Sequence, residues 1–133
     1  MQGPLAIAIP GEVAGYWDAK ERYGNPDMTW SRIVQPTVDM CRQGIPVSAS
    51  LAAALAPKNY TDPGMISVFV NPDTGKVWTE GDMYTNPALA DTLEMMAGAG
   101  DDGADMFYTG EIATKIIADL REQGKLFISI ECK

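Results

Sequence analysis

Histidine is missing from the sequence altogether, and cysteine occurs only twice, as Cys41 and Cys132. Without histidine the chain has no Cys/His zinc site, no Cys-His nucleophile pair and no Ser-His-Asp triad. Two cysteines so far apart are more often free and buried than paired, and a disulfide between them stays an open alternative. Because Cys41 lies in an amphipathic stretch, we expect it to pack inside the protein.

Positive charge is scarce as well, with 10 basic against 18 acidic residues and a formal net charge of −8. No basic cluster occurs along the chain, which argues against nucleic acid and anionic membranes as partners. The apolar runs are too short to cross a bilayer. Residues Met1 to Pro4 lack the basic region of a signal peptide, so we expect either a cytosolic protein or a true start further upstream.

The remaining composition is that of a soluble globular protein. Of the 133 residues, 46% are hydrophobic and 21% charged. A chain of this length is about one domain and buries roughly two-thirds of its unfolded surface. The acidic balance is therefore interpreted as a solubility feature.

The first apolar run, Leu5 to Ile9, predicts a strand buried on both faces, because no polar residue interrupts it. Such a strand needs neighbours, and this chain offers few. Pro10 and Gly11 end the run, and a helix is expected from Glu12 to Tyr23.

Further helices are predicted where apolar residues recur at helical spacing behind a capping residue. They span residues 30–43, 51–56, 87–97 and 110–123. The capping residues are Thr29, Ser48 or Ser50, and Asn86, and Thr109 precedes the last helix. Pro36 lies inside the first of these helices, so a kink or a break is expected near Gln35.

Between residues 58 and 85 the pattern is irregular. Asp62-Pro63-Gly64 predicts a turn, and residues 73–76 predict a hairpin-like connection between strands at 68–70 and 77–78. A last short strand is expected at 126–130. The fold class is thus mainly α with a few short strands.

Three acidic residues, Asp101, Asp102 and Asp105, invite a metal site. They lack the alternate spacing, central glycine and late glutamate of a calcium loop, which favours a solvated helix connection. Gly11 and Gly15 likewise lack the spacing of a dinucleotide loop. Neither a metal nor a cofactor is indicated.

Two further motifs have a structural and a functional interpretation. Met95 and Met96 either line a soft binding surface or fill the core, and core filling is the commoner use. Asn59-Tyr60-Thr61 forms an N-glycosylation sequon, which makes Asn59 a candidate site if the chain enters a secretory pathway.

Four blocks of residues, in order, resemble the large subunit of the γ-glutamyltransferases, also called glutathione hydrolases. The first holds Ala8-Ile9-Pro10-Gly11-Glu12, Gly15-Tyr16, Ala19 and Tyr23-Gly24; the second Trp30, Ile33, Gln35-Pro36, Val38, Met40, Arg42-Gln43-Gly44, Pro46-Val47 and Leu51 to Leu55; the third Pro87 to Leu93; the fourth Gly103-Ala104, Phe107-Tyr108 and Gly110 to Ala113. The similarity covers about Leu5 to Phe127 but only one interior section of the family's precursor.

The resemblance implies an incomplete section of the αββα fold of N-terminal nucleophile hydrolases, with residues 1–133 as a partial large-subunit domain. In this family the precursor cleaves itself and exposes a threonine at the start of the small subunit. That threonine attacks the γ-glutamyl carbonyl of glutathione, and water or an acceptor amine resolves the acyl-enzyme. The implied partners are the small subunit and glutathione, and the implied location is periplasmic, secreted or on the extracellular face of the plasma membrane.

No catalytic, substrate-binding or metal-binding residue is carried over from the family. The nucleophile belongs to the small subunit, and the substrate-binding arginine belongs just upstream of the opening strand. Thr109 and Thr114 are internal and are not assigned that role. Residues 125–133 depart from the family pattern, which we interpret as a divergent tail from truncation, a retained intron or an incomplete gene model.

The resulting hypothesis is a fragment of a γ-glutamyltransferase that is inactive by itself. The first alternative is a non-enzymatic short form that binds a full-length or small-subunit partner through its uncovered apolar faces. The second is an independent helical binding module, which predicts a cooperative thermal transition in isolation.

Overall fold

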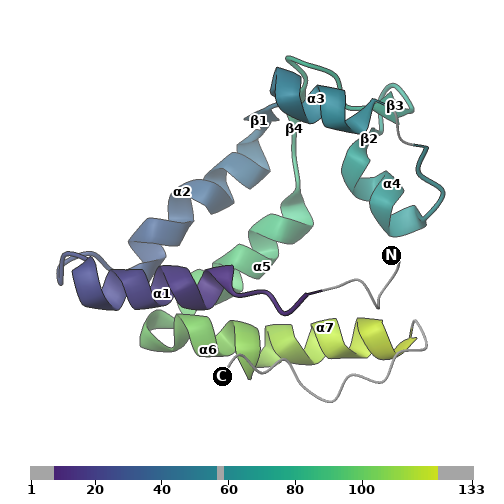
Figure 1. Ribbon diagram of the computed structural model, residues 1–133. Helices are drawn as coiled ribbons and strands as arrows, with labels where there is room; N and C mark the ends of the chain where they lie inside the picture. The colour runs from purple at the N-terminus through teal and green to yellow at the C-terminus, as the bar shows by residue number, and fades with distance from the viewer. Residues whose placement is uncertain (1–7, 57–58, 123–133) are drawn as a thin grey trace. The chain divides into compact units, whose positions relative to one another are not determined.

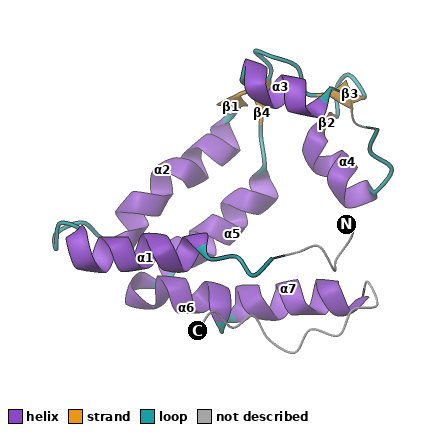
Figure 2. Ribbon diagram, in the orientation of Figure 1, coloured by secondary structure: helices purple, strands orange, loops and turns teal. Residues whose placement is uncertain are grey.

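The computed structural model describes residues 8–56 and 59–122 of the chain (Figure 1). Helices dominate these residues and the strands are short, which confirms the predicted fold class (Figure 2). The chain divides into two compact units. The first unit comprises the described residues up to Gln35 and from Thr92 onward, and the second comprises Pro36–Asp91.

The elements of the first unit are helical. They are α1 (Glu12–Tyr23), the start of α2 (Trp30–Gln43), the end of α5 (Pro87–Gly98), the 3-10 turn η2 (Gly100–Asp102), α6 (Gly103–Tyr108) and α7 (Glu111–Glu122). Helix α1 has the predicted bounds, and its polarity suits the helix dipole, with Glu12 in the first turn and Arg22 in the last. The N–H of Gly24 closes it by donating to the carbonyl of Lys20 at 2.8 Å.

The predicted strand from Leu5 to Ile9 is wrong for the two of its residues that the structure describes. Residues 5–7 lie outside the described part, and Ala8, Ile9 and Pro10 form no strand. Ile9 is 60% exposed. A buried strand needs a neighbouring strand for its backbone, and the described part of this unit contains only helices around α1. The predicted strand at 126–130 and the tail at 125–133 also lie outside the described residues.

Helix α2 starts as predicted, because the N–H of Arg32 donates to the Thr29 hydroxyl at 3.3 Å. It continues through Pro36 to Gln43, so the alternative of a break into two helices is wrong. The apolar stripe continues on both sides of the proline, where Val34 and Val38 are buried. This burial offsets the one backbone hydrogen bond that a proline removes.

Cys41 lies on the same stripe of α2 and is 1% exposed with a free thiol. The prediction that it packs inside the protein is confirmed. Cys132 lies outside the described residues.

The second unit holds two short antiparallel ladders, two complete helices, the end of α2 and the start of α5. The ladders pair β1 (Ile45–Pro46) with β4 (Met83–Tyr84) and β2 (Val70–Asn71) with β3 (Lys76–Val77), and the complete helices are α3 (Ala49–Leu55) and α4 (Pro63–Phe69). Ser48 caps α3 by accepting the N–H of Leu51 at 3.2 Å, which decides between the two predicted caps.

The predicted turn at Asp62-Pro63-Gly64 is wrong, because these residues begin α4. The Asp62 carboxylate accepts the N–H of Met65 at 3.0 Å, and Pro63 occupies the first turn. An Asp-Pro pair serves a helix start as well as a turn, since both use a side-chain acceptor and a fixed φ. The hairpin exists but starts later than predicted, because Val68 and Phe69 belong to the helix.

A small apolar core holds the second unit together around Val47, Leu55 and Trp78. The indole N–H of Trp78 donates to the carbonyl of Val68 at 3.0 Å. Its ring meets Tyr84 edge to face, with centroids 5.5 Å apart. Trp78 therefore joins the helical and hairpin parts of this unit.

In the first unit, α7 supplies the buried side chains of Ile112, Ala113 and Ile117. Met96 is buried in α5, which confirms core filling for that methionine. Helix α6 was not predicted, because its six residues follow a glycine-rich segment and are too few to show a period. No helix in the described residues has the length and apolarity needed to span a membrane.

Candidate functional site

A pocket of about 480 Å³, open to solvent, lies on the second unit. Helix α4 and the β2–β3 hairpin form it together with the loop before α4. The lining residues are Asn59, Tyr60, Ile66, Val70, Gly75, Lys76 and Val77. Sequence reasoning did not find this pocket, because its walls meet only when the hairpin closes on α4.

The walls of the pocket are mostly apolar. Val70 and Val77 are register partners across the ladder, so their side chains lie on one face. The Tyr60 ring stacks on Phe69, with centroids 5.2 Å apart and planes at 24°. Such a surface can hold an apolar group, and Lys76 is a basic residue of its lining.

Outside this pocket, the acidic residues and threonines considered in the sequence do not come together in a site. Asp101 and Asp102 lie in η2 and Asp105 in α6. Across residues 8–56 and 59–122 there is no group of three or more histidine, cysteine, aspartate or glutamate residues that could hold a metal ion. Thr109 and Thr114 each donate their hydroxyl to a backbone carbonyl four residues earlier, at 3.1 Å.

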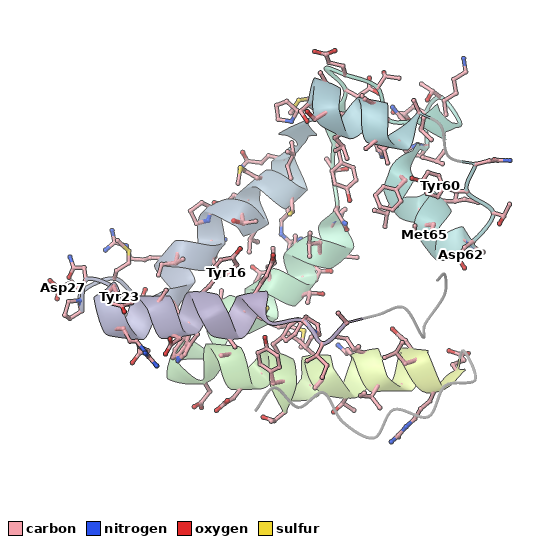
Figure 3. The ribbon with its side chains drawn as sticks, in the orientation of Figure 1. Tyr16, Tyr23, Asp27, Tyr60, Asp62 and Met65 are labelled. Atoms are coloured by element: carbon pink, nitrogen blue, oxygen red, sulfur yellow. The ribbon has the colours of Figure 1, made fainter. Side chains whose placement is uncertain are left out.

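Asn59 is exposed, on the loop between α3 and α4 (Figure 3 shows the neighbouring Tyr60 and Asp62). Thr61 of the same sequon is also exposed, whereas Tyr60 between them is half-buried. The structure thus presents both recognition side chains of the sequon at the surface.

The start of α1 is fixed by the Tyr108 hydroxyl of α6. That hydroxyl donates to the carbonyl of Pro10 at 2.7 Å and accepts the N–H of Ala14 at 3.1 Å. The Ala14 N–H lies in the first turn of α1, where backbone donors have no intrahelical partner, and the Pro10 carbonyl lies just before the N-cap Gly11. Sequence reasoning missed this role, since the two partners are 98 and 94 positions away.

Replacing Tyr108 with phenylalanine removes both hydrogen bonds and keeps the ring. We expect a loss of about 1 to 2 kcal/mol in the free energy of unfolding, with faster amide exchange at Ala14. Urea titration and hydrogen exchange measure the two effects. Tyr23→Phe is the matched control, because Tyr23 is 84% exposed. Equal unfolding midpoints for the two variants would contradict the bridging role.

The turn from Thr79 to Asp82, in the second unit, holds the Asp82 carboxylate through hydrogen bonds that lower its pKa. The Thr79 N–H donates to the Asp82 carboxylate at 2.8 Å, and the Thr79 hydroxyl donates to it at 2.9 Å. These bonds, the backbone one first, hold the pKa of Asp82 below its ordinary value. The turn is anchored to Val47, whose N–H donates to the carbonyl of Asp82 at 2.9 Å.

Because the pKa of Asp82 is lower in the folded chain, its contribution to stability is present at neutral pH. That contribution is lost as the pH falls through the folded pKa. NMR titration of the Asp82 carboxyl carbon measures the shift directly. In Thr79→Val, which removes the hydroxyl and keeps the N–H, the pKa should rise only part of the way. An Asp82 pKa at its ordinary value in the unmodified chain would refute this account.

Comparison with solved structures defines the class of protein to which this fold belongs. The γ-glutamyltranspeptidase of Helicobacter pylori superposes with a TM-score of 0.81 at 26% identity, over 97% of this chain and 36% of that one. The chain is thus built as a section of an N-terminal nucleophile hydrolase, as predicted.

Sequence comparison then gives the family. Residues 1–130 match the gamma-glutamyltranspeptidase family, and the chain belongs to it. It is 34% identical to Scoloptoxin SSD14 of Scolopendra dehaani, over 99% of this chain and 22% of that protein. It is also 34% identical to Glutathione hydrolase proenzyme 1 of Schizosaccharomyces pombe, over 92% of this chain and 19% of that protein. The chain therefore spans about a fifth of the length of these relatives.

Proposed function

We propose that this chain serves as a section of the large subunit of a γ-glutamyltransferase of the glutathione hydrolase type, and that by itself it does not turn over substrate. The family match over residues 1–130 is the observation that carries the proposal. The activity of the whole family member is γ-glutamyl transfer from glutathione to water or to an amine, through an N-terminal threonine acyl-enzyme.

The described residues support the proposal that this section does not turn over substrate by itself. Their threonines at positions 109 and 114 lie inside the chain, and each hydroxyl is engaged with a helix carbonyl. A hydroxyl nucleophile of this class uses the α-amine of its own residue as base, which an internal threonine does not have. The partners that complete the enzyme are a threonine-bearing small subunit and glutathione, in an extracellular or periplasmic setting.

The test is a turnover assay with a γ-glutamyl anilide. We expect the purified 133-residue chain to release no product above background. The Schizosaccharomyces pombe relative, purified in the same way, is the positive control. Product release by the chain alone, proportional to its concentration, would overturn the proposal.

A further inference from the structure

Three of the four asparagines in the sequence have a local structural role, and Asn59 does not. The other three each precede a proline, at Asn25, Asn71 and Asn86. Each accepts a nearby backbone N–H through its side-chain oxygen, at 2.9, 2.9 and 3.0 Å. The Asn59 side chain makes no hydrogen bond to any described residue and is followed by tyrosine and threonine. Its amide is therefore not committed to a turn or a helix cap.

The packing of the sequon turns its recognition groups toward solvent. Tyr60 is held by its stacked ring on Phe69, 5.2 Å between centroids, and packs against the unit's apolar core. Asn59 and Thr61 on either side of it are exposed. The segment ends at Asp62, the cap of α4, so the sequon lies in irregular backbone between two helices. Glycosylated asparagines of this motif lie in surface loops of this kind.

We propose that Asn59 is a site of N-linked glycosylation. The co-reactant is an oligosaccharide joined to a lipid through a diphosphate. The carboxamide nitrogen of Asn59 forms a bond to C1 of the first sugar, the bond from C1 to the diphosphate oxygen breaks, and the lipid diphosphate leaves with the electron pair. The nitrogen loses one proton to a base of the transferring enzyme.

The position of Asn59 gives the modification a local consequence. Asn59 also lines the pocket on the second unit, as does the exposed Ile66. A glycan on Asn59 places its first sugar at the rim of that pocket. The inference goes beyond the proposed function and rests on it only for the extracytoplasmic setting.

Translation of the full chain behind a cleavable signal peptide, in the presence of rough microsomes, tests the proposal. We expect one glycan to be added, seen as a single mobility shift that an endoglycosidase removes. Asn59→Gln and Thr61→Ala should lose the shift completely, whereas Thr61→Ser, which keeps the hydroxyl, should retain it. The shift is read on a denaturing gel, so a variant that fails to fold still gives an answer.

Two outcomes would overturn the site. One is an unshifted chain while a known acceptor protein is modified in the same reaction. The other is a shift that persists in Asn59→Gln. Glycan addition is measured by mobility and γ-glutamyl turnover by the anilide assay, so failure of one is distinguishable from failure of the other.

Discussion

Trp78→Ala should cost the second unit about 3 to 5 kcal/mol of its free energy of unfolding. Trp78 is 8% exposed and packs with Val47 and Leu55, so the truncation leaves a large cavity in a small core. It also leaves the carbonyl of Val68 without the indole donor. Since a domain is stable by only about 5 to 15 kcal/mol, most of this unit's stability is at risk.

The two buried tryptophans allow a matched comparison. Trp30 is 5% exposed in the first unit, and its indole N–H has no hydrogen-bond partner among the described residues, whereas that of Trp78 is bonded. Replacement by phenylalanine removes an indole N–H that is hydrogen-bonded at Trp78 and one that is not hydrogen-bonded at Trp30. We expect Trp78→Phe to be the more destabilising by about 1 kcal/mol. Urea unfolding followed by circular dichroism measures both variants, and the reverse order would contradict the assignment.

Gly110→Ala should destabilise the first unit by about 1 to 3 kcal/mol. A Cβ at Gly110 would lie 2.8 Å from both the Cα and the carbonyl oxygen of Met106. Both are backbone atoms, so the connection between α6 and α7 has to shift rather than a flexible side chain. The alanine would thus disturb the packing of these two helices.

Gly15→Ala is the control for the Gly110 variant. Gly15 lies inside α1, and a Cβ there meets no described atom within 4 Å. Alanine in an unobstructed helix interior is favoured over glycine by about 0.5 to 1 kcal/mol, so this variant should be more stable. Thermal unfolding of the two variants beside the unmodified chain gives the signs. A loss in Gly15→Ala, or no loss in Gly110→Ala, would contradict the geometry.

Helix starts were predictable from the sequence where the signal is local. Thr29 and Ser48 accept a backbone N–H three residues later, and Asn86 does the same at the start of α5. The wrong assignments come from patterns that serve two structures. Asp62-Pro63-Gly64 suits a turn and a helix start equally, and only the packing of the following apolar residues decides between them.

The candidate site was predictable only where its signal is local in the sequence. The sequon at Asn59 is a local pattern, and the family resemblance depends on ordered blocks of residues. The pocket and the Tyr108 bridge depend on contacts between residues far apart in sequence. A single sequence carries no direct signal for such contacts.

The thiol of Cys41 has a practical consequence for measuring this protein. It is free and almost completely covered, so a thiol reagent reaches it only when the structure around it opens. In a chain with Cys132 replaced by serine, the rate of covalent labelling divided by that of an unprotected thiol gives the fraction of open molecules. Time-resolved mass spectrometry would then report the opening of the structure around Cys41 at native conditions, without denaturant.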